Sequence, residues 1–153
     1  MVKTSPADNL ATLYSGRARN AVDNSNRVML PADWRGKGAP ARFFVLAEGD
    51  HLLVCPAEIW GATVAELRGA TADKTLIPDI ERELNRRACQ VSLDRFGRLP
   101  LPREFTTALG IQGHADLLGR YSKFEIWSID KPAQPTAASA AAAALVAEKL
   151  KYL

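Results

Sequence analysis

Two stretches of this chain repeat the same spacing of an aspartate and an arginine. Val22–Arg35 reads VDNSNRVMLPADWR and Leu93–Thr106 reads LDRFGRLPLPREFT, and they align without a gap at an offset of 71 residues (94 minus 23). Each has an aspartate, three residues, an arginine, a short apolar run and a proline. A guanidinium matches phosphate oxygens and the guanine edge, whereas an aspartate in a turn caps backbone amides. The pattern therefore predicts either a nucleic acid-binding turn present twice or a repeated structural ion pair.

Arginines exceed acidic residues around both stretches. The first copy has Arg17, Arg19, Arg27 and Arg35 against Asp23 and Asp33, and the second has Arg86, Arg87, Arg95, Arg98 and Arg103 against Asp94. This excess fits a surface laid along DNA, where each neutralised phosphate adds counterion release. In the structural alternative the aspartate caps the turn while the arginine packs and bonds to carbonyls. We assign Asp23 and Asp94 a structural role in both cases, because a carboxylate repels phosphate unless an arginine covers it.

Short strands and helices are expected to position these turns. Residues 14–22 alternate weakly, with Arg17 and Arg19 on one face of the expected strand, and 27–30 and 98–101 read as strands that each end at a proline suited to start a helix. Pro100 requires an edge or bulge position in the second strand. Asn26 and Gly97 occupy the same slot of the two turns, so we expect positive φ at both.

The repeat continues through two expected hairpins. Residues 43–47 and 51–55 form the first, and residues 115–118 and 123–128 form its partner, with Leu53 matched to Phe124 and Cys55 to Ile126 at the same offset. Helices are expected at 56–68 and 77–87 and after Pro102, the last stopping at Gly110. An alanine-rich helix is expected at 140–153, which either docks on a neighbouring subunit or stays exposed.

These elements predict an α+β fold that is mainly β, with two tandem repeats sharing one pseudo-twofold core and helices outside. The expected boundaries are a flexible extension at 1–13, a first repeat at 14–68, a helical connector at 69–87, a second repeat at 88–130, and a linker with the C-terminal helix at 131–153. Repeats of this length would be small for independent cores, which favours a shared one.

Composition narrows the class of function. The chain has 153 residues, a formal net charge of +3 and two cysteines, Cys55 and Cys89, without a CxxC spacing. No apolar run approaches membrane-spanning length and no signal peptide is recognisable, so we expect a cytoplasmic protein. His51 and His114 lack a paired ligand at zinc spacing, and no phosphate-binding glycine loop is present. We therefore expect no enzyme, metal, cofactor or small-molecule substrate.

The chain resembles the MraZ family of bacterial transcriptional regulators, which are built from two tandem SpoVT-AbrB (swapped-hairpin) repeats. The resemblance covers about residues 14–130 and is carried by YSGR at 14–17, DNSNR at 23–27, LP at 30–31, DRFGR at 94–98, LPLP at 99–102 and KFEIW at 123–127. It implies binding to short direct repeats of double-stranded DNA upstream of the division and cell-wall gene cluster, including the regulator's own promoter. It also implies a ring-shaped homo-oligomer located at the nucleoid.

The same resemblance suggests which residues contact DNA. Arg27 and Arg98 match the motif arginines, Arg17 and Arg19 lead into the first turn, and Arg95 lies inside the second. Asp23, Asp94, Asn26 and Gly97 match the structural positions of the motif. The chain departs from the family pattern at Asn26, where a glycine is usual, at Pro100, in the extension at 1–13 and in the loop GKGAP.

Two other classes of function remain open from the sequence. One is an antitoxin-type swapped-hairpin regulator, although a single repeat with a disordered tail would be the expected plan for it. The other is a ring-forming assembly protein whose arginine surface binds acidic partners. Salt-sensitive binding to DNA with preference for direct repeats separates a regulator from an assembly protein.

Overall fold

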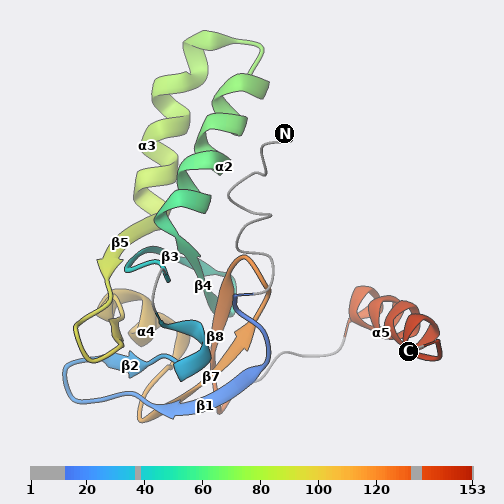
Figure 1. Cartoon of the computed structure of the whole chain (residues 1–153). Helices are drawn as coiled ribbons and strands as arrows, with labels where there is room; N and C mark the ends of the chain where they lie inside the picture. Colours follow the sequence, from blue (N-terminus) through green and yellow to red (C-terminus); the bar gives the residue numbers. More distant parts are fainter. Residues whose placement is uncertain (1–12, 37–38, 132–135, 153) are drawn as a thin grey trace.

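The computed structural model describes residues 13–36, 39–131 and 136–152, and Figure 1 gives its element labels. The strands are β1 (Arg17–Ala21), β2 (Arg27–Met29), β3 (Arg42–Glu48), β4 (His51–Pro56), β5 (Ala88–Ser92), β6 (Arg98–Pro100), β7 (His114–Gly119) and β8 (Phe124–Ser128). The helices are α2 (Ala57–Ala70), α3 (Ile77–Arg87), α4 (Arg103–Leu109) and α5 (Ala137–Leu150), with short 3-10 turns η1 (Ala32–Trp34) and η2 (Lys74–Leu76). The predicted α+β fold class is confirmed.

Six strands form one antiparallel sheet in the order β1-β7-β8-β4-β3-β5. The order reads the same from either end once the two repeats are equated, because β1 corresponds to β5, β7 to β3 and β8 to β4. Each repeat lends its first strand to the other, since β1 pairs with β7 and β5 pairs with β3. The chain therefore forms one sheet with a pseudo-twofold axis between β4 and β8 (Figure 1).

A second sheet contains only β2 and β6, which pair with Val28 opposite Leu99. Beyond the strands, the amide of Leu30 donates to the carbonyl of Gly97 at 3.0 Å, and the amide of Leu101 donates to the carbonyl of Asn26 at 2.9 Å. These two bonds are pseudo-twofold counterparts at the 71-residue offset. Both strands of the pair are edges, which explains why Pro100 is tolerated inside β6.

The core lies between the two sheets. Burial alternates along β8, where Phe124, Ile126 and Ser128 are buried and the intervening side chains are half-exposed. Tyr14 and Trp34 pack edge-on with ring centres 5.7 Å apart, and Phe124 lies 4.9 Å from Trp34. Each such buried side chain contributes roughly 1.5–3 kcal/mol. The short sheet that carries the turns is thus anchored on the large one.

The predicted match between the hairpins is wrong by one residue. Val54 pairs with Phe124 and Leu53 with Glu125, so Leu53 faces outward while Phe124 is buried. The inward residues Leu52 and Val54 correspond to Phe124 and Ile126, a shift of 72 residues (124 minus 52). Because side chains alternate between the two faces of a strand, a slip of one residue exchanges inside for outside. The turns match at an offset of 71 residues and the hairpins at 72, so the segment between turn and hairpin is one residue longer in the second repeat.

The helix predictions are confirmed in outline. α3 and the stop of α4 at Gly110, with φ 68°, agree with the expectation. The segment after Pro31 forms only the 3-10 turn η1. α5 begins at Ala137 rather than at 140, because Thr136 caps it and exchanges hydrogen bonds with Ser139. Residues 1–12 of the expected extension at 1–13, and residues 132–135 of the linker, lie outside the described residues.

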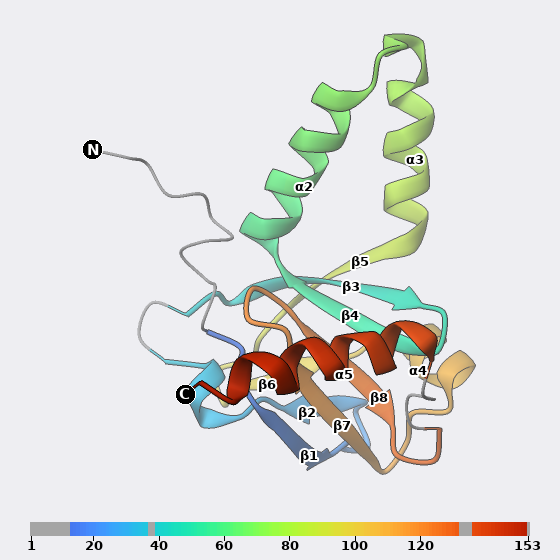
Figure 2. The same cartoon turned by 90° about the vertical axis from the view of Figure 1, so that its right-hand side faces the viewer.

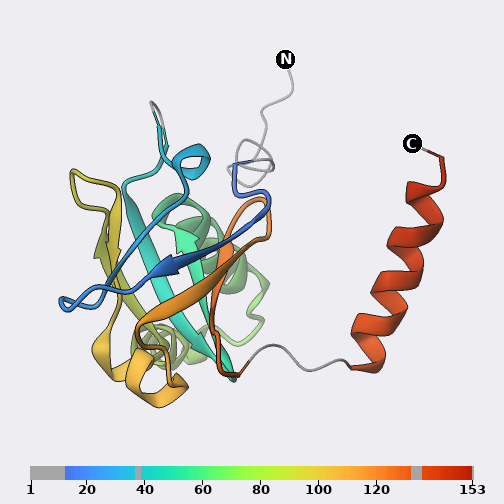
Figure 3. The same ribbon diagram turned by 90° about the horizontal axis from the view of Figure 1, so that it is seen from below.

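The α2–α3 hairpin projects from one end of the sheet, and α5 lies apart from the body on the side of β7 and β8 (Figures 1 and 2). Viewed from below, the turns before β2 and β6 lie on the side of the body away from α5 (Figure 3). None of the described helices is long and apolar enough to cross a membrane.

Candidate nucleic acid interface

The two Asp-x-x-x-Arg turns share one hydrogen-bond pattern. Asp23 Oδ1 accepts from the amides of Ser25 at 3.0 Å and Arg27 at 2.9 Å. Asp94 Oδ1 accepts from the amides of Phe96 at 2.8 Å and Arg98 at 2.9 Å. In both turns the aspartate amide also donates to the carbonyl of the arginine. The aspartates therefore hold the two turns in the same shape.

The residue before each arginine has a left-handed backbone. Asn26 has φ 61° and Gly97 has φ 86°. Asn26 is buried, and its Nδ2 donates to the carbonyl of Leu101 at 2.8 Å and to Thr106 Oγ1 at 2.9 Å. Asparagine tolerates this conformation better than most residues, and its side chain here ties the first turn to the second repeat. The first turn thus keeps the backbone shape that glycine gives the second.

The motif arginines contact the aspartates of both turns. Arg27 Nε lies 3.1 Å from Asp23 Oδ2, and Arg98 Nε lies 2.7 Å from Asp94 Oδ2. Across the axis, Arg27 Nη1 lies 3.6 Å from Asp94 Oδ2 and Arg98 Nη1 lies 3.9 Å from Asp23 Oδ2. We call these four residues the quartet. Their side chains are 25–35% exposed, so solvent reaches the quartet.

The quartet is neutral as a whole, which differs from the basic surface that the local arginine excess suggested. Hydrogen bonds, above all from the Arg27 amide, lower the pKa of Asp23. Desolvation raises the pKa of Asp94, but the bonds from Arg98 and the Phe96 amide outweigh it and the net pKa is lowered. Both carboxylates are therefore ionised at neutral pH. Within the described residues, no protein acceptor is found for Nη2 of either arginine, which leaves these N–H groups available to a ligand.

The second turn carries an exposed aromatic ring that the first lacks. Phe96 is 53% exposed, and the guanidinium carbons of Arg95 and Arg98 lie 4.7 and 5.0 Å from its ring centre. The first turn has Asn24 and Ser25 in the positions of Arg95 and Phe96. Sequence reasoning included Arg95 but missed Phe96, although an aromatic residue between arginines in a polar turn could have suggested it. Arg95 thus adds a positive charge beside the quartet on the side of the second turn.

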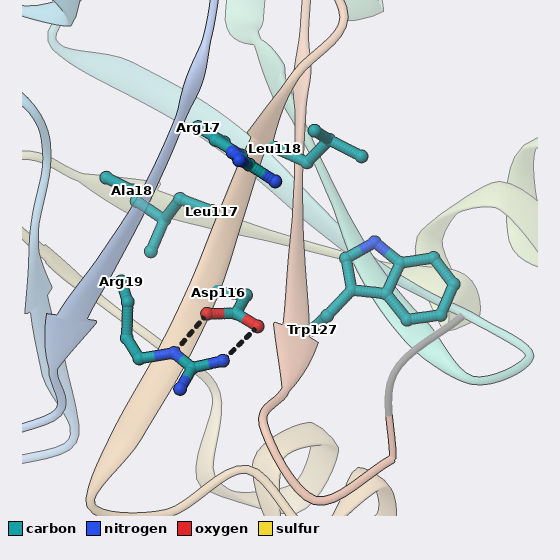
Figure 4. A pocket seen from close by; sticks show the side chains of 7 residues that line it. All are labelled: Arg17, Ala18, Arg19, Asp116, Leu117, Leu118 and Trp127. Atoms are coloured by element: carbon teal, nitrogen blue, oxygen red, sulfur yellow. Dashed lines mark hydrogen bonds and ion pairs between the residues drawn. The ribbon is translucent and has the colours of Figure 1, made fainter.

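Arg17 and Arg19 lie on a different surface. Asn20, on the inner face of β1, donates to the carbonyl of Met29 in β2, so Arg17 and Arg19 project from the opposite face. Arg19 forms a two-pronged ion pair with Asp116, at 2.7 and 3.0 Å (Figure 4). The hydrogen bonds of this pair lower the pKa of Asp116 and raise the pKa of Arg19. The structure therefore does not bring these two arginines together with the quartet.

The remaining ionisable residues build no metal site within the described residues. No group of three or more histidine, cysteine, aspartate or glutamate side chains is placed to hold a metal ion there. His51 stacks on Trp127 with ring centres 4.4 Å apart. Cys55 is buried, which raises the pKa of its thiol to about 11 and makes it a poor nucleophile at neutral pH.

Comparison with known proteins identifies the family. No protein-family model matches the chain. The transcriptional regulator MraZ of Chlorobium phaeovibrioides is 30% identical over 132 residues, which cover 74% of this chain and 83% of that protein. The chain belongs to the MraZ family. The MraZ regulators of Thermomicrobium roseum, at 27% identity over 92% of this chain and 99% of that protein, and of Nitrosomonas eutropha, at 25% over 78% and 83%, are also similar.

The MraZ similarity extends over most of the described fold, because the Thermomicrobium protein matches 147 residues. The shared hydrogen-bond pattern of the two turns agrees with the tandem repeat found in the sequence. Membership of a family of transcriptional regulators also agrees with the expectation that the chain is not an enzyme.

Proposed function

We propose that this chain is a DNA-binding transcriptional regulator without catalytic activity, and that its DNA contact is centred on the quartet and on Arg95. One observation carries the proposal. The two turns have the same hydrogen bonds and present two half-exposed guanidinium groups with free N–H donors, in a chain of the MraZ family. Guanidinium donors in this position suit phosphate oxygens and the O6 and N7 atoms of guanine.

The neutrality of the quartet predicts how it discriminates between DNA sequences. Non-specific binding depends on counterion release, which is small for a group whose charges cancel. A specific base contact instead depends on donors held in a fixed orientation, and the carboxylates of Asp23 and Asp94 fix the guanidinium planes of Arg27 and Arg98. Each chain would therefore bind a single site weakly but select its sequence.

Weak single sites require several contacts at once. Short direct repeats bound by adjacent subunits of a ring would convert later contacts into intramolecular ones, and the affinity would rise if the spacings match. We propose such repeats upstream of the division and cell-wall gene cluster, the chain's own promoter included, and a homo-oligomeric ring at the nucleoid. Each chain would consist of two repeats, at 14–68 and 88–130, that together form the DNA-binding unit, and the connector at 69–87 would join them. Arg17 and Arg19, on the far face of β1, are secondary candidates.

The test is binding of the full chain to promoter DNA. Fluorescence anisotropy would compare a labelled duplex that carries direct repeats with a duplex of scrambled sequence, at several salt concentrations. We expect preference for the repeats, weakened by salt, and a loss of about 1–3 kcal/mol per engaged site for Arg27→Ala or Arg98→Ala. Arg82→Ala, which removes an exposed arginine paired with Asp79 on α3, is the matched control.

The outcome that overturns the proposal is equal binding to both duplexes, or unchanged binding by the two quartet variants. Because Arg27→Ala leaves Asp23 and Asp94 with only the Arg98 guanidinium between them, a thermal melt accompanies each measurement. Arg27→Lys keeps the positive charge but loses the planar fork, so it separates charge from base recognition. Binding to acidic proteins without DNA preference would favour the assembly protein instead.

A further inference from the structure

On the outer face of the large sheet, the first turns of α2 pack over one half, whereas no described element packs over the equivalent half. Phe44 pairs with Cys55 in the first hairpin, and at the 72-residue shift (116 minus 44) their counterparts are Asp116 and Trp127, which pair in the second. α2 covers the first pair, since Trp60 stacks on Phe44 with ring centres 5.2 Å apart. Among the described residues, no element covers the second pair.

The open half contains a hollow of about 480 Å³ (Figure 4). It is lined by Arg17, Ala18, Arg19, Asp116, Leu117, Leu118 and Trp127. Leu118 is 43% exposed, whereas its counterpart Leu46 is 8% exposed. Leu118 is therefore far more open to solvent than its counterpart in the first repeat.

α5 is the counterpart of α2 in the order of elements along the second repeat. Like α2 it has 14 residues, and like α2 it follows the last strand of its repeat. All its described side chains are exposed, and Leu145, Val146 and Leu150 are 70%, 56% and 55% exposed. A lone helix of this length is marginally stable in water, so its apolar side chains require a partner. It lies off the side of the molecule where β7 and β8 are, without packing on them (Figures 1 and 2).

We propose that α5 of one chain binds the open half of the outer sheet face on a second copy of this chain. The inference rests on the proposed function, since it names the contact between subunits of the proposed ring. A helix of 14 residues is about 21 Å long, and the six residues of β7 span about 20 Å. The helix therefore matches the strand along which it would lie.

The composition of the open half favours a second copy over permanent cover by the same chain. The half under α2 has the apolar residues Phe44 and Leu46 at the positions where the open half has Asp116 and Leu118. A paired charge, Arg19 with Asp116, therefore lies beside the exposed Leu118 and the half-buried Trp127. An apolar centre with a polar rim is typical of surfaces that are solvated before they meet a partner.

The contact would also determine the symmetry of the assembly. The helix and the sheet face are different surfaces, so one chain offers a helix to its neighbour and receives one from the other side. Such a head-to-tail contact closes into a ring or continues as a filament. A closed dimer would form only if each of the two chains bound the α5 helix of the other at the same time.

Variants of each surface test the contact in the full chain. Leu118→Glu alters the open face, and Leu145→Glu/Leu150→Glu alters α5, which supports no other described element. Leu76→Glu, at a residue 48% exposed between α2 and α3, is the matched control. Light scattering after gel filtration is expected to show a multi-subunit wild type and control, and monomers for both surface variants. A mixture of the two surface variants is expected to form a one-to-one dimer, because one supplies an intact helix and the other an intact face.

Other outcomes overturn the contact. They are a monomeric wild type, an unchanged mass for either surface variant, or dissociation of the α5 variant alone, which would indicate helix pairing between α5 segments. Monomers in every sample with a lowered melting temperature for the variants would indicate docking within one chain. Binding of each variant to a duplex with a single DNA site is measured in parallel. If that binding is retained while the masses contradict the contact, only this inference fails; if the wild type binds no DNA, the proposed function fails.

Discussion

The Arg27 guanidinium lies 3.6 Å from the carboxylate of Asp94, a residue of the other repeat. The reciprocal contact, between Arg98 and Asp23, is 3.9 Å long. Each arginine therefore bridges its own turn and the turn of the other repeat. The two turns therefore form one unit, and a substitution in either turn alters the ion pairs of both.

Removing one carboxylate is expected to separate specificity from affinity. Asp23→Asn keeps a side-chain oxygen to cap the turn but removes its charge, so the quartet acquires a net charge of +1. We expect tighter binding to scrambled DNA, a steeper salt dependence and a smaller preference for direct repeats. Anisotropy titrations at several salt concentrations measure all three. Unchanged binding to scrambled DNA would show that the quartet lies away from the DNA.

Phe96 is expected to orient the arginines of the second turn. Phe96→Ser, which gives this turn the residue of the first, removes an exposed cation–π contact worth about 0.5–1 kcal/mol. Binding to direct repeats should weaken by about two- to fivefold at an unchanged melting temperature. Leu76→Ser, far from the turns, serves as the control for loss of an exposed apolar side chain without a change of charge. An equal effect of both variants would contradict a role of Phe96 in binding.

Asn26 is expected to stabilise the fold through its side chain. Asn26→Ala loses the bonds to Leu101 and Thr106 and places alanine at positive φ, for a cost of about 2–4 kcal/mol. Asn26→Gly loses the same bonds without the backbone strain, so we expect a cost smaller by about 1 kcal/mol. Urea unfolding measures the difference. A glycine variant as unstable as the alanine variant would show that backbone conformation is unimportant at this position.

The turns are expected to lose stability in acid. The pKa values of Asp23 and Asp94 are lower in the folded chain than the ordinary value near 3.9. The unfolded chain therefore takes up protons first, so this stabilisation is complete above about pH 4 and is lost as pH falls through the folded pKa values. Urea unfolding between about pH 2 and pH 5 should show a steeper loss for the wild type than for Asp23→Asn/Asp94→Asn. Parallel curves would place the acid-sensitive groups elsewhere.

Local chemistry accounts for the features that sequence reasoning predicted well. Asp23 and Asp94 cap turns because their side chains reach amides only two and four residues away. Gly110 ends α4 because it adopts a left-handed conformation at little cost. The resemblance to the MraZ family likewise depends on residues close together in the chain, and the family comparison bears it out.

Features that depend on distant parts of the chain were missed. The match of Leu53 with Phe124 was wrong because a loop difference before the hairpins changed which residues face inward. Arg17 and Arg19 closely precede the first turn in sequence, yet β1 pairs with β7 and directs them to the opposite face. Residues close together in the chain determine neither the effect of the loop-length difference on the hairpin register nor the face of β1 from which the two arginines project.

The sequence by itself determined that the chain contains two like turns, their backbone shape and the family to which they belong. Only the tertiary structure decided that the arginines neutralise one another's aspartates and that one half of the sheet is left without a covering helix. The physical reason is range. Turns and helix ends form through bonds between neighbours, whereas a crossed ion pair and an open sheet face arise only when strands from the two repeats pair in one register.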